Sequence, residues 1–193
     1  MRIVGGCFKG RALAAPEGRA TRPTSDRARE SIFNILEHAP WAPGVAERRV
    51  IDLFAGSGAL GFEAISRGAA FCLFIETDAA ARGAIRQNVE AFALFGATRL
   101  HRRDATDLGA RPAGLAAPFD LAFLDPPYRA GLGERALANL LPGGWITPDA
   151  TIVLECAADE APETPGFAVR DERIWGAAKV LFLTVSPHLP AQA

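Results

Sequence analysis

The sequence of 193 residues predicts an α/β fold in which a mainly parallel sheet packs against helices. Short apolar runs alternate with longer segments of helical character between about residue 50 and residue 155. A glycine-rich turn follows the first of these runs, and two further strand-like runs lie near the end of the chain. Strands that alternate with helices are joined by crossovers, and crossovers make neighbouring strands parallel.

The individual elements can be assigned in chain order. Strands are predicted at Val50–Phe54, Phe71–Ile75, Leu121–Leu124 and Ile152–Leu154, with a weaker candidate at Thr98–Arg103. Helices are predicted near Ala59–Arg67, Ala79–Phe95 and Leu132–Leu140. Gly68 and Gly96 stand where C-terminal helix caps are expected. Phe167–Trp175 and Lys179–Val185, joined by Gly176, predict a closing antiparallel hairpin.

The amino-terminal part differs from this pattern. Residues 1–20 predict a short hairpin punctuated by glycines, followed by a helix with Thr24 or Ser25 as its N-cap. Ala28, Ile32, Ile35 and Leu36 would give that helix one apolar face. We therefore divide the chain into a basic hairpin (1–22), a main domain (23–187) and a disordered tail (188–193).

Charge is distributed unevenly along the chain. Residues 1–30 carry seven basic and three acidic side chains, whereas the other residues carry 14 basic and 19 acidic ones. A basic arm on an acidic body suits a polyanionic partner, although it can also be a solvated face. Three dispersed cysteines and three histidines show no metal-ligand or disulfide spacing, so no metal is predicted. No signal peptide or membrane-spanning run is recognised, so we expect a cytoplasmic protein without a membrane partner.

The glycine-rich turn indicates a nucleotide-like cofactor. Gly56, Gly58 and Gly61 match GxGxxG after the first strand, and Glu76 lies 20 residues after Gly56, where a carboxylate can hold ribose hydroxyls. This spacing alone fits both nicotinamide and S-adenosylmethionine enzymes. Asp52 favours the second class, because a carboxylate would repel a pyrophosphate and attract a cationic methionine group. It could instead cap a nearby turn. Asp104 is a candidate partner for the adenine amine, or a solvated loop acid.

The sequence Asp125-Pro-Pro-Tyr128 follows the apolar run Leu121–Leu124. In an open parallel sheet, such a position lies at the ligand-binding edge. Asp125 and the Pro126 carbonyl could accept hydrogen bonds from an exocyclic base amine and favour its reactive, pyramidal form. Tyr128 could stack on a base that has left its helix or loop. The alternative is that the prolines merely end a strand and that Tyr128 packs in the core.

With both motifs present, the chain resembles the RsmD-type family of bacterial 16S ribosomal RNA guanine-N2 methyltransferases. The segments that carry the resemblance are Arg2–Gly6, Lys9–Leu13, Arg22–Arg27, Glu30–Asn34, Asp52–Gly68, Phe74–Asp78, Asn88 and Asp125–Tyr128. The resemblance implies a Rossmann-like S-adenosylmethionine-dependent methyltransferase fold, with a seven-stranded, mainly parallel sheet, an antiparallel terminal hairpin and a small N-terminal β-hairpin. It implies methylation of the N2 amine of a guanine in 16S rRNA, at position 966 in the usual RNA numbering.

The predicted site residues fall into three groups. The catalytic group is Asp125, Pro126, Pro127 and Tyr128, and the cofactor group is Asp52, Phe54, Gly56, Gly58, Glu76, Thr77, Asp104 and Ala105. The RNA-binding group is Lys9, Arg11, Arg22, Arg27 and Arg129. We expect a monomer that acts on the small ribosomal subunit or on an assembly intermediate of it.

Three other functions remain open at this point. A DNA amino methyltransferase shares Asp125–Tyr128 but usually needs a separate target-reading region, for which this chain leaves little room. A non-catalytic RNA-binding assembly factor would not be expected to keep that motif intact. A nicotinamide oxidoreductase is disfavoured by Asp52.

Overall fold

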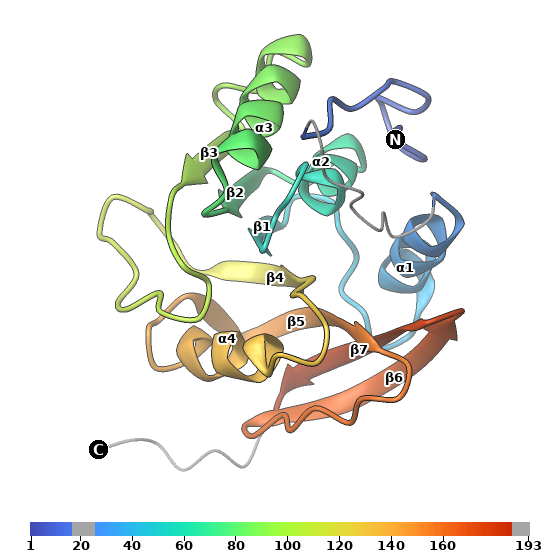
Figure 1. The fold of residues 1–193 in the computed structure, drawn as a ribbon, viewed down its shortest axis with the longest axis vertical. Helices are drawn as coiled ribbons and strands as arrows, with labels where there is room; N and C mark the ends of the chain where they lie inside the picture. Colours follow the sequence, from blue (N-terminus) through green and yellow to red (C-terminus); the bar gives the residue numbers. More distant parts are fainter. Residues whose placement is uncertain (17–25, 187–193) are drawn as a thin grey trace. The chain divides into compact units, whose positions relative to one another are not determined.

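The structure is a computed structural model that describes residues 1–16 and 26–186. Arg22, the predicted N-caps Thr24 and Ser25, and the predicted tail 188–193 lie outside the described residues. The chain forms two compact units, Met1–Ala105 and Thr106–Ala193. Figure 1 labels the helices and strands of both.

The first unit contains three parallel strands. These are β1 (Arg49–Leu53), β2 (Phe71–Ile75) and β3 (Thr98–His101), in the order β3-β2-β1. Helices α2 (Ala59–Ser66) and α3 (Ala79–Ala91) connect them, with α2 packed on β1 and β2 and α3 packed on β3 (Figure 1). All strand residues after the first in β1 and β2 are buried, as expected for parallel strands with covered faces.

The amino-terminal hairpin and the following helix also belong to the first unit. An antiparallel bridge joins Arg2 to Ala12, and the Ile3 amide donates to the Arg11 carbonyl at 3.0 Å. The prediction of a short hairpin is therefore confirmed within residues 1–16. Helix α1 (Asp26–His38) buries Ala28, Ile32 and Leu36 of the predicted apolar face.

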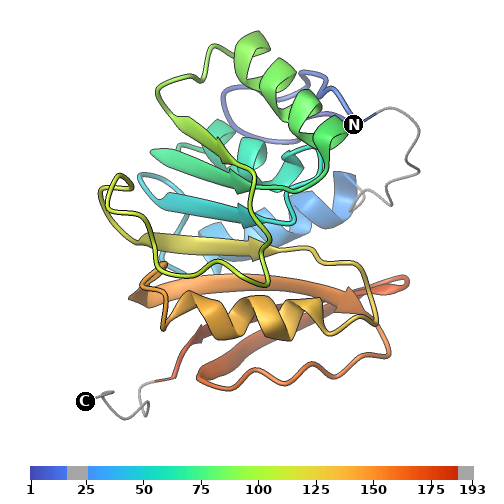
Figure 2. The ribbon, with the colours of Figure 1, turned by 60° about the vertical axis from the view of Figure 1, so that its left-hand side comes forward.

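The second unit contains four strands and one helix. Strands β4 (Phe119–Leu124) and β5 (Ile146–Ala157) are parallel, whereas β6 (Phe167–Trp175) and β7 (Ala178–Val185) complete the order β4-β5-β7-β6 through antiparallel pairs. Helix α4 (Leu132–Leu140) packs along β5, as Figure 2 shows. The predicted α/β fold, with seven strands and an antiparallel terminal hairpin, is confirmed.

One predicted helix boundary is wrong. Helix α3 ends at Ala91, and the residue that turns the chain in the left-handed conformation is Ala93, with φ 56°. Gly96 has no positive φ and does not cap the helix. By contrast, Gly68 follows α2 with φ 95°, as predicted. A glycine near a helix end indicates a cap, but hydrogen bonding decides where the helix stops: the Ala93 amide donates to the Glu90 carbonyl in a tight last turn.

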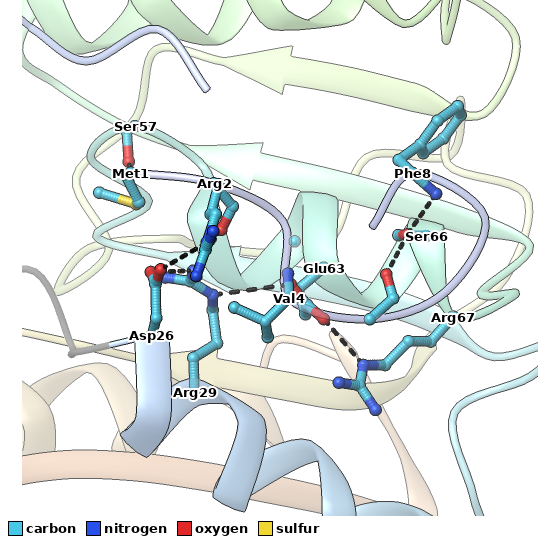
Figure 3. Close-up of polar contacts among 12 residues, drawn as sticks. Met1, Arg2, Val4, Phe8, Asp26, Arg29, Ser57, Glu63, Ser66 and Arg67 are labelled. Atoms are coloured by element: carbon cyan, nitrogen blue, oxygen red, sulfur yellow. Dashed lines mark hydrogen bonds and ion pairs between the residues drawn. The ribbon is translucent and has the colours of Figure 1, made fainter. Parts of the chain in front are cut away.

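A buried carboxylate on α2 holds the amino-terminal hairpin. Glu63 has no exposed surface and accepts a hydrogen bond from the Val4 amide at 2.8 Å. Two arginines lie on either side of it: Arg67 Nε at 2.9 Å and Arg29 Nε at 3.6 Å (Figure 3). Arg29 also donates to the Arg2 carbonyl at 2.5 Å. Opposite charges on both sides offset the cost of burying Glu63, so the hairpin has a fixed place on α1 and α2.

Replacing Glu63 is expected to destabilise the protein far more than replacing Glu37, although both carboxylates contact Arg67. Glu63→Ala removes the buried carboxylate that Arg67 and Arg29 share and leaves them only their more exposed partners, Glu37 and Asp26. Loss of one member of a buried ion pair costs about 3–5 kcal/mol. Glu37, whose side chain is 29% exposed, bonds Arg67 at 3.0 Å, and its loss should cost about 1 kcal/mol or less. Urea unfolding of the two variants measures both costs. Equal destabilisation would contradict the structural role given to Glu63.

Candidate functional site

The glycine-rich loop joins β1 to α2 and has an unusual backbone. Phe54, Gly56 and Gly58 all have positive φ, at 60°, 54° and 79°. Glycine adopts this conformation readily, but a bulky side chain such as that of Phe54 does so only when the surroundings enforce it. Such outliers concentrate at ligand sites. The predicted cofactor residue Phe54 is therefore a strained, half-buried residue at the end of β1.

Two of the three motif glycines serve different purposes. A Cβ atom on Gly61 would lie 2.3 Å from Phe74 and 2.6 Å from Cys72, so glycine lets α2 pack directly on β2. A Cβ on Gly56 would meet no heavy atom nearer than 4.0 Å. Gly56 is thus required by its backbone conformation, and the space beside it is not filled by protein.

Glu76 fixes the conformation of this loop. Its carboxylate accepts hydrogen bonds from the Gly56 amide (2.8 Å) and from the Asp78 amide (2.7 Å). Parallel pairing of Leu53 with Ile75 puts Glu76 beside the start of the loop. Each carboxylate oxygen can accept more than one hydrogen bond, so Glu76 retains capacity for ribose hydroxyls. The sequence spacing indicated the ribose role but not the bond to Gly56.

Asp52 is turned into the protein. Its side chain is 2% exposed and accepts a hydrogen bond from the Gly61 amide at 2.9 Å. Burial raises the pKa of Asp52 to about 8, the Gly61 hydrogen bond opposes this rise, and the nearby Glu76 carboxylate adds to it. The capping alternative considered for Asp52 is therefore what the geometry shows. Attraction of a cationic ligand would also require ionisation of this group.

Asn88 ties the loop to the amino-terminal segment. Its Oδ1 accepts from the Ala14 amide at 2.8 Å, and its Nδ2 donates to the carbonyls of Ala14 (3.1 Å) and Ser57 (3.3 Å). Asn88 is 2% exposed. Family resemblance singled out this residue, but only the tertiary structure shows its contacts, since 74 residues separate it from Ala14.

The other predicted cofactor residues follow β2 and β3. Thr77 is exposed directly after Glu76, and Asp104 is exposed three residues after the end of β3. Ala105 is 4% exposed, so its side chain offers little surface. The first unit therefore brings Asp52, the glycine loop and Glu76 together at the carboxyl edge of β1 and β2.

The second unit carries the Asp125–Tyr128 motif at the carboxyl end of β4. Asp125 and Tyr128 are half-buried, Pro126 is buried and Pro127 is exposed. A small surface pocket is lined by all of these except Asp125, and by residues of α4 and β5. The phenol of Tyr128 donates to Glu155 Oε1 at 2.5 Å. The motif thus lies at a strand end, as predicted. Glu155 lines the pocket beside it, and the sequence did not reveal this residue.

Arg129 is held by acidic groups that follow β5. Its guanidinium contacts both carboxylate oxygens of Asp159 at 2.9 Å, and its amide donates to Glu160 at 2.8 Å. The hydrogen bond from Arg129 lowers the pKa of Asp159. Both side chains of this ion pair are about two-thirds exposed, so salt screens it and a phosphate can compete for Arg129.

The predicted RNA-binding residues of the first unit have different environments. Lys9 and Arg27 are exposed. Arg11 is exposed as well, and its guanidinium lies 4.2 Å from the centroid of the Phe92 ring and donates to the Ala91 carbonyl at 2.6 Å. Arg11 therefore attaches the hairpin to the end of α3, in addition to any contact with a partner.

The described residues contain neither a cluster of metal-binding side chains nor a helix that could span a membrane. Within residues 1–16 and 26–186, no group of three or more His, Cys, Asp or Glu side chains is placed to hold a metal ion. In the same residues, none of the helices has the length and apolarity that a membrane span requires. Cys72 and Cys156 are buried free thiols.

Asp52→Asn is expected to change how stability depends on pH. The pKa of the Asp52 carboxyl is about 8 in the folded protein and near its ordinary value of 3.8 when unfolded, so between these pH values the folded state binds one proton more than the unfolded state. Stability contributed by that proton is present at acid pH and falls as pH rises, by roughly 1.4 kcal/mol per pH unit.

The asparagine amide keeps an acceptor for Gly61 but does not titrate, so the variant should gain stability relative to wild type from pH 5 to pH 7. Denaturant unfolding of both proteins at several pH values measures the difference. A constant difference across this range would show that Asp52 is ionised in the folded protein.

Comparison with known proteins places these motifs in one family. A family model described as Conserved hypothetical protein 95 matches residues 1–184. The chain is 36% identical over 178 residues to "Ribosomal RNA small subunit methyltransferase D" of Escherichia coli K12, which covers 91% of this chain and 85% of that protein. It is 38% identical over 167 residues to "Putative rRNA methyltransferase YlbH" of Bacillus subtilis 168, covering 86% of this chain and 88% of that one.

Solved structures agree with this assignment. The structure described as "Putative methyltransferase yhhF from Escherichia coli" matches with a TM-score of 0.80 at 32% identity, covering 96% of this chain and 97% of that one. A putative RNA methyltransferase of Pyrococcus horikoshii, at 16% identity and a TM-score of 0.65, shares the fold. The predicted Rossmann-like methyltransferase fold is thereby confirmed. The chain belongs to the Conserved hypothetical protein 95 family, and its resemblance to the RsmD-type methyltransferases is confirmed.

Proposed function

We propose that this protein transfers the methyl group of S-adenosylmethionine to the N2 amine of a guanine in 16S rRNA, and that the target corresponds to position 966. The observation that carries the proposal is the Asp125–Tyr128 motif at the end of β4, beside a pocket and with its tyrosine anchored by Glu155. Relatives at 33–38% identity are named as rRNA methyltransferases, which supports rRNA over DNA as the substrate. We propose a monomeric, cytoplasmic enzyme acting on the small subunit or on an assembly intermediate.

The residues of the glycine loop suit this cofactor. Glu76 offers a fixed carboxylate to the ribose hydroxyls, and the unfilled space at Gly56 admits a ligand close to the backbone. Phe54, Gly58, Thr77, Asp104 and Ala105 are proposed to complete the binding site. Asp52 is proposed to contribute indirectly, by holding Gly61 and hence the start of α2.

S-adenosylmethionine supplies an activated methyl group, so the protein needs no metal or covalent nucleophile for this reaction. The lone pair of a guanine amine is conjugated with the ring, and the amine is a weak nucleophile for that reason. The two N–H groups of the amine donate hydrogen bonds, one to the Asp125 carboxylate and one to the Pro126 carbonyl. These hydrogen bonds orient the lone pair and stabilise the positive charge that develops on nitrogen. Tyr128 stacks on the extruded base.

Incubation with labelled S-adenosylmethionine and 16S rRNA or small-subunit particles tests the function. The methylated base is then identified by nuclease digestion and mass spectrometry. RNA that carries inosine at the target provides a sharp control, because inosine lacks the exocyclic amine of guanine. Methylation of the inosine-containing RNA at that base, or of another base type, would refute N2 transfer. Cofactor binding without any transfer would instead favour a non-catalytic assembly factor.

Asp125→Ala is expected to slow methyl transfer and leave cofactor binding nearly unchanged. Loss of one fixed acceptor at the amine costs roughly 3 kcal/mol in the transition state, or about 100-fold in rate. Single-turnover rates with saturating cofactor and RNA measure this loss, and calorimetry measures cofactor affinity. Asp149→Ala removes an exposed carboxylate from β5 of the same unit and serves as the control. A rate within a few-fold of wild type would exclude Asp125 from the reaction.

Removing exposed positive charge from the amino-terminal part should weaken RNA binding and reduce its dependence on salt. Lys9 and Arg27 suit this test because both are exposed, whereas Arg11 has the packing role described above. Each lost phosphate contact lowers the slope of log affinity against log salt by about one unit, so Lys9→Ala with Arg27→Ala lowers it by up to about two.

The control removes the same charge elsewhere, from the exposed Arg86 and Arg170, because general electrostatic attraction would respond equally to both pairs. Filter binding of rRNA fragments at several salt concentrations provides the slopes. If the two double variants behave alike, the amino-terminal part has no special role in RNA binding.

A further inference from the structure

We propose that Glu155 is a positioning residue for the Asp125–Tyr128 motif: it fixes the orientation of the Tyr128 ring on which the target base stacks. This inference rests on the proposed methyl transfer to a base and deepens it. Glu155 is not part of the sequence motif and lies 27 residues after Tyr128. The two residues meet because of the strand pairing in the second unit.

The register of the sheet puts Glu155 beside the motif. Strands β4 and β5 are parallel, and Leu124 at the end of β4 pairs with Leu154. The residues that follow this pair are Asp125, directly after the end of β4, and Glu155, within β5. Strand β5 is longer than β4 and continues through Glu155 to Ala157, so Glu155 belongs to a regular strand rather than to a loop. Its backbone is therefore a rigid support for whatever its side chain holds.

The side-chain contact is short and shielded. Glu155 is 7% exposed, and its Oε1 lies 2.5 Å from the hydroxyl oxygen of Tyr128. A carboxylate removed from water needs hydrogen-bond donors, and the phenol supplies one. Bonds from a hydroxyl to a carboxylate are short and stronger than neutral ones. A tyrosine ring has two rotatable bonds, so fixing its hydroxyl end restricts the whole ring.

Neighbouring acidic groups hold the next residue of the same loop. Glu160 accepts the Arg129 amide at 2.8 Å, and Asp159 pairs with the Arg129 guanidinium. Arg129 has a φ of 58°, a strained value that these contacts help to maintain. The end of β5 and the turn after it thus hold the loop at two successive positions, Tyr128 through its side chain and Arg129 through its backbone.

Three substitutions test the role of Glu155 in the full-length protein. Glu155→Leu removes the acceptor with little change in volume, Glu155→Gln keeps an acceptor oxygen, and Tyr128→Phe removes the hydroxyl but keeps the ring. Loss of a hydrogen bond to a charged group corresponds to about a tenfold change or more. We therefore expect kcat for rRNA methylation to fall about tenfold in Glu155→Leu and Tyr128→Phe, and to fall much less in Glu155→Gln. The affinity for S-adenosylmethionine should not change in any of them.

The double variant distinguishes positioning from an independent role. If Glu155 acts through the Tyr128 hydroxyl, Glu155→Leu adds no further loss to Tyr128→Phe. Losses in kcat that multiply in the double variant would overturn the proposal. Glu172→Leu, which removes an exposed carboxylate from β6, is the matched control and should leave kcat unchanged.

A spectroscopic measurement is independent of catalysis. Tyr128 is the single tyrosine of the sequence, so protein labelled with ¹³C-tyrosine gives ring signals from this residue alone. In wild type and Glu155→Gln the ring signals should show one restrained environment. In Glu155→Leu they should shift toward those of a mobile ring. The melting temperature of the variant shows whether the whole protein has lost structure or only the ring has become mobile.

Unchanged ring signals in a folded Glu155→Leu protein would overturn the positioning role. Should Glu155→Leu fail to fold, the comparison of Glu155→Gln with Tyr128→Phe remains: a loss in Glu155→Gln as large as that in Tyr128→Phe would also overturn it. If wild type methylates no RNA, the proposed function fails, whereas the tyrosine signals still report whether Glu155 holds the ring.

Discussion

The hydrogen bond from the Gly56 amide to Glu76 fixes the loop on which the proposed cofactor site of the first unit depends. It joins the loop after β1 to the end of β2, and parallel pairing of these strands brings the two groups within 2.8 Å. The left-handed residues Phe54, Gly56 and Gly58 are maintained by this bond together with that from Gly61 to Asp52. The proposed cofactor site therefore depends on two acidic side chains, Glu76 and Asp52, that accept hydrogen bonds from the backbone of the loop and of α2.

The amino-terminal hairpin is attached to the same loop and helix. Asn88 bonds both Ser57 of the loop and Ala14 after the hairpin, and Glu63 of α2 accepts the Val4 amide. Isolated hairpins are marginally stable, so these buried contacts explain how so short a segment keeps a defined position. A basic segment with a fixed position can present its exposed cations to RNA with less loss of conformational entropy than a flexible tail.

In the second unit, the position of Tyr128 depends on sheet register in a similar way. The motif residues come directly after β4. The groups that hold this loop are Glu155, which belongs to β5 because that strand continues to Ala157, and Glu160 in the turn after β5. Methyl transfer to a base amine gains its rate mainly from orientation, because the methyl donor is already activated. A carboxylate that fixes a stacking ring is consistent with that requirement.

The sequence by itself determined the order and type of the elements, the glycine loop and the Asp125–Tyr128 motif. These features depend on local patterns: apolar runs of strand length, helical periodicity, and residue types with special backbone preferences. The predicted ends of elements were less accurate. The left-handed residue after α3 is Ala93 and not the predicted Gly96, because hydrogen bonding in the last turn decides where a helix stops.

Only the tertiary structure decided what each carboxylate does. Glu63 and Glu155 stand in the sequence as single acids next to apolar residues, and Asp52 stood out only because it precedes the glycine loop. Burial and hydrogen-bond partners distinguish the three acids. Glu63 lies between two arginines, Asp52 accepts the Gly61 amide and has a raised pKa, and Glu155 anchors Tyr128. Those partners lie 4 to 34 residues away along the chain. The fold brings most of them together, and local sequence pattern carries no record of such long-range contacts.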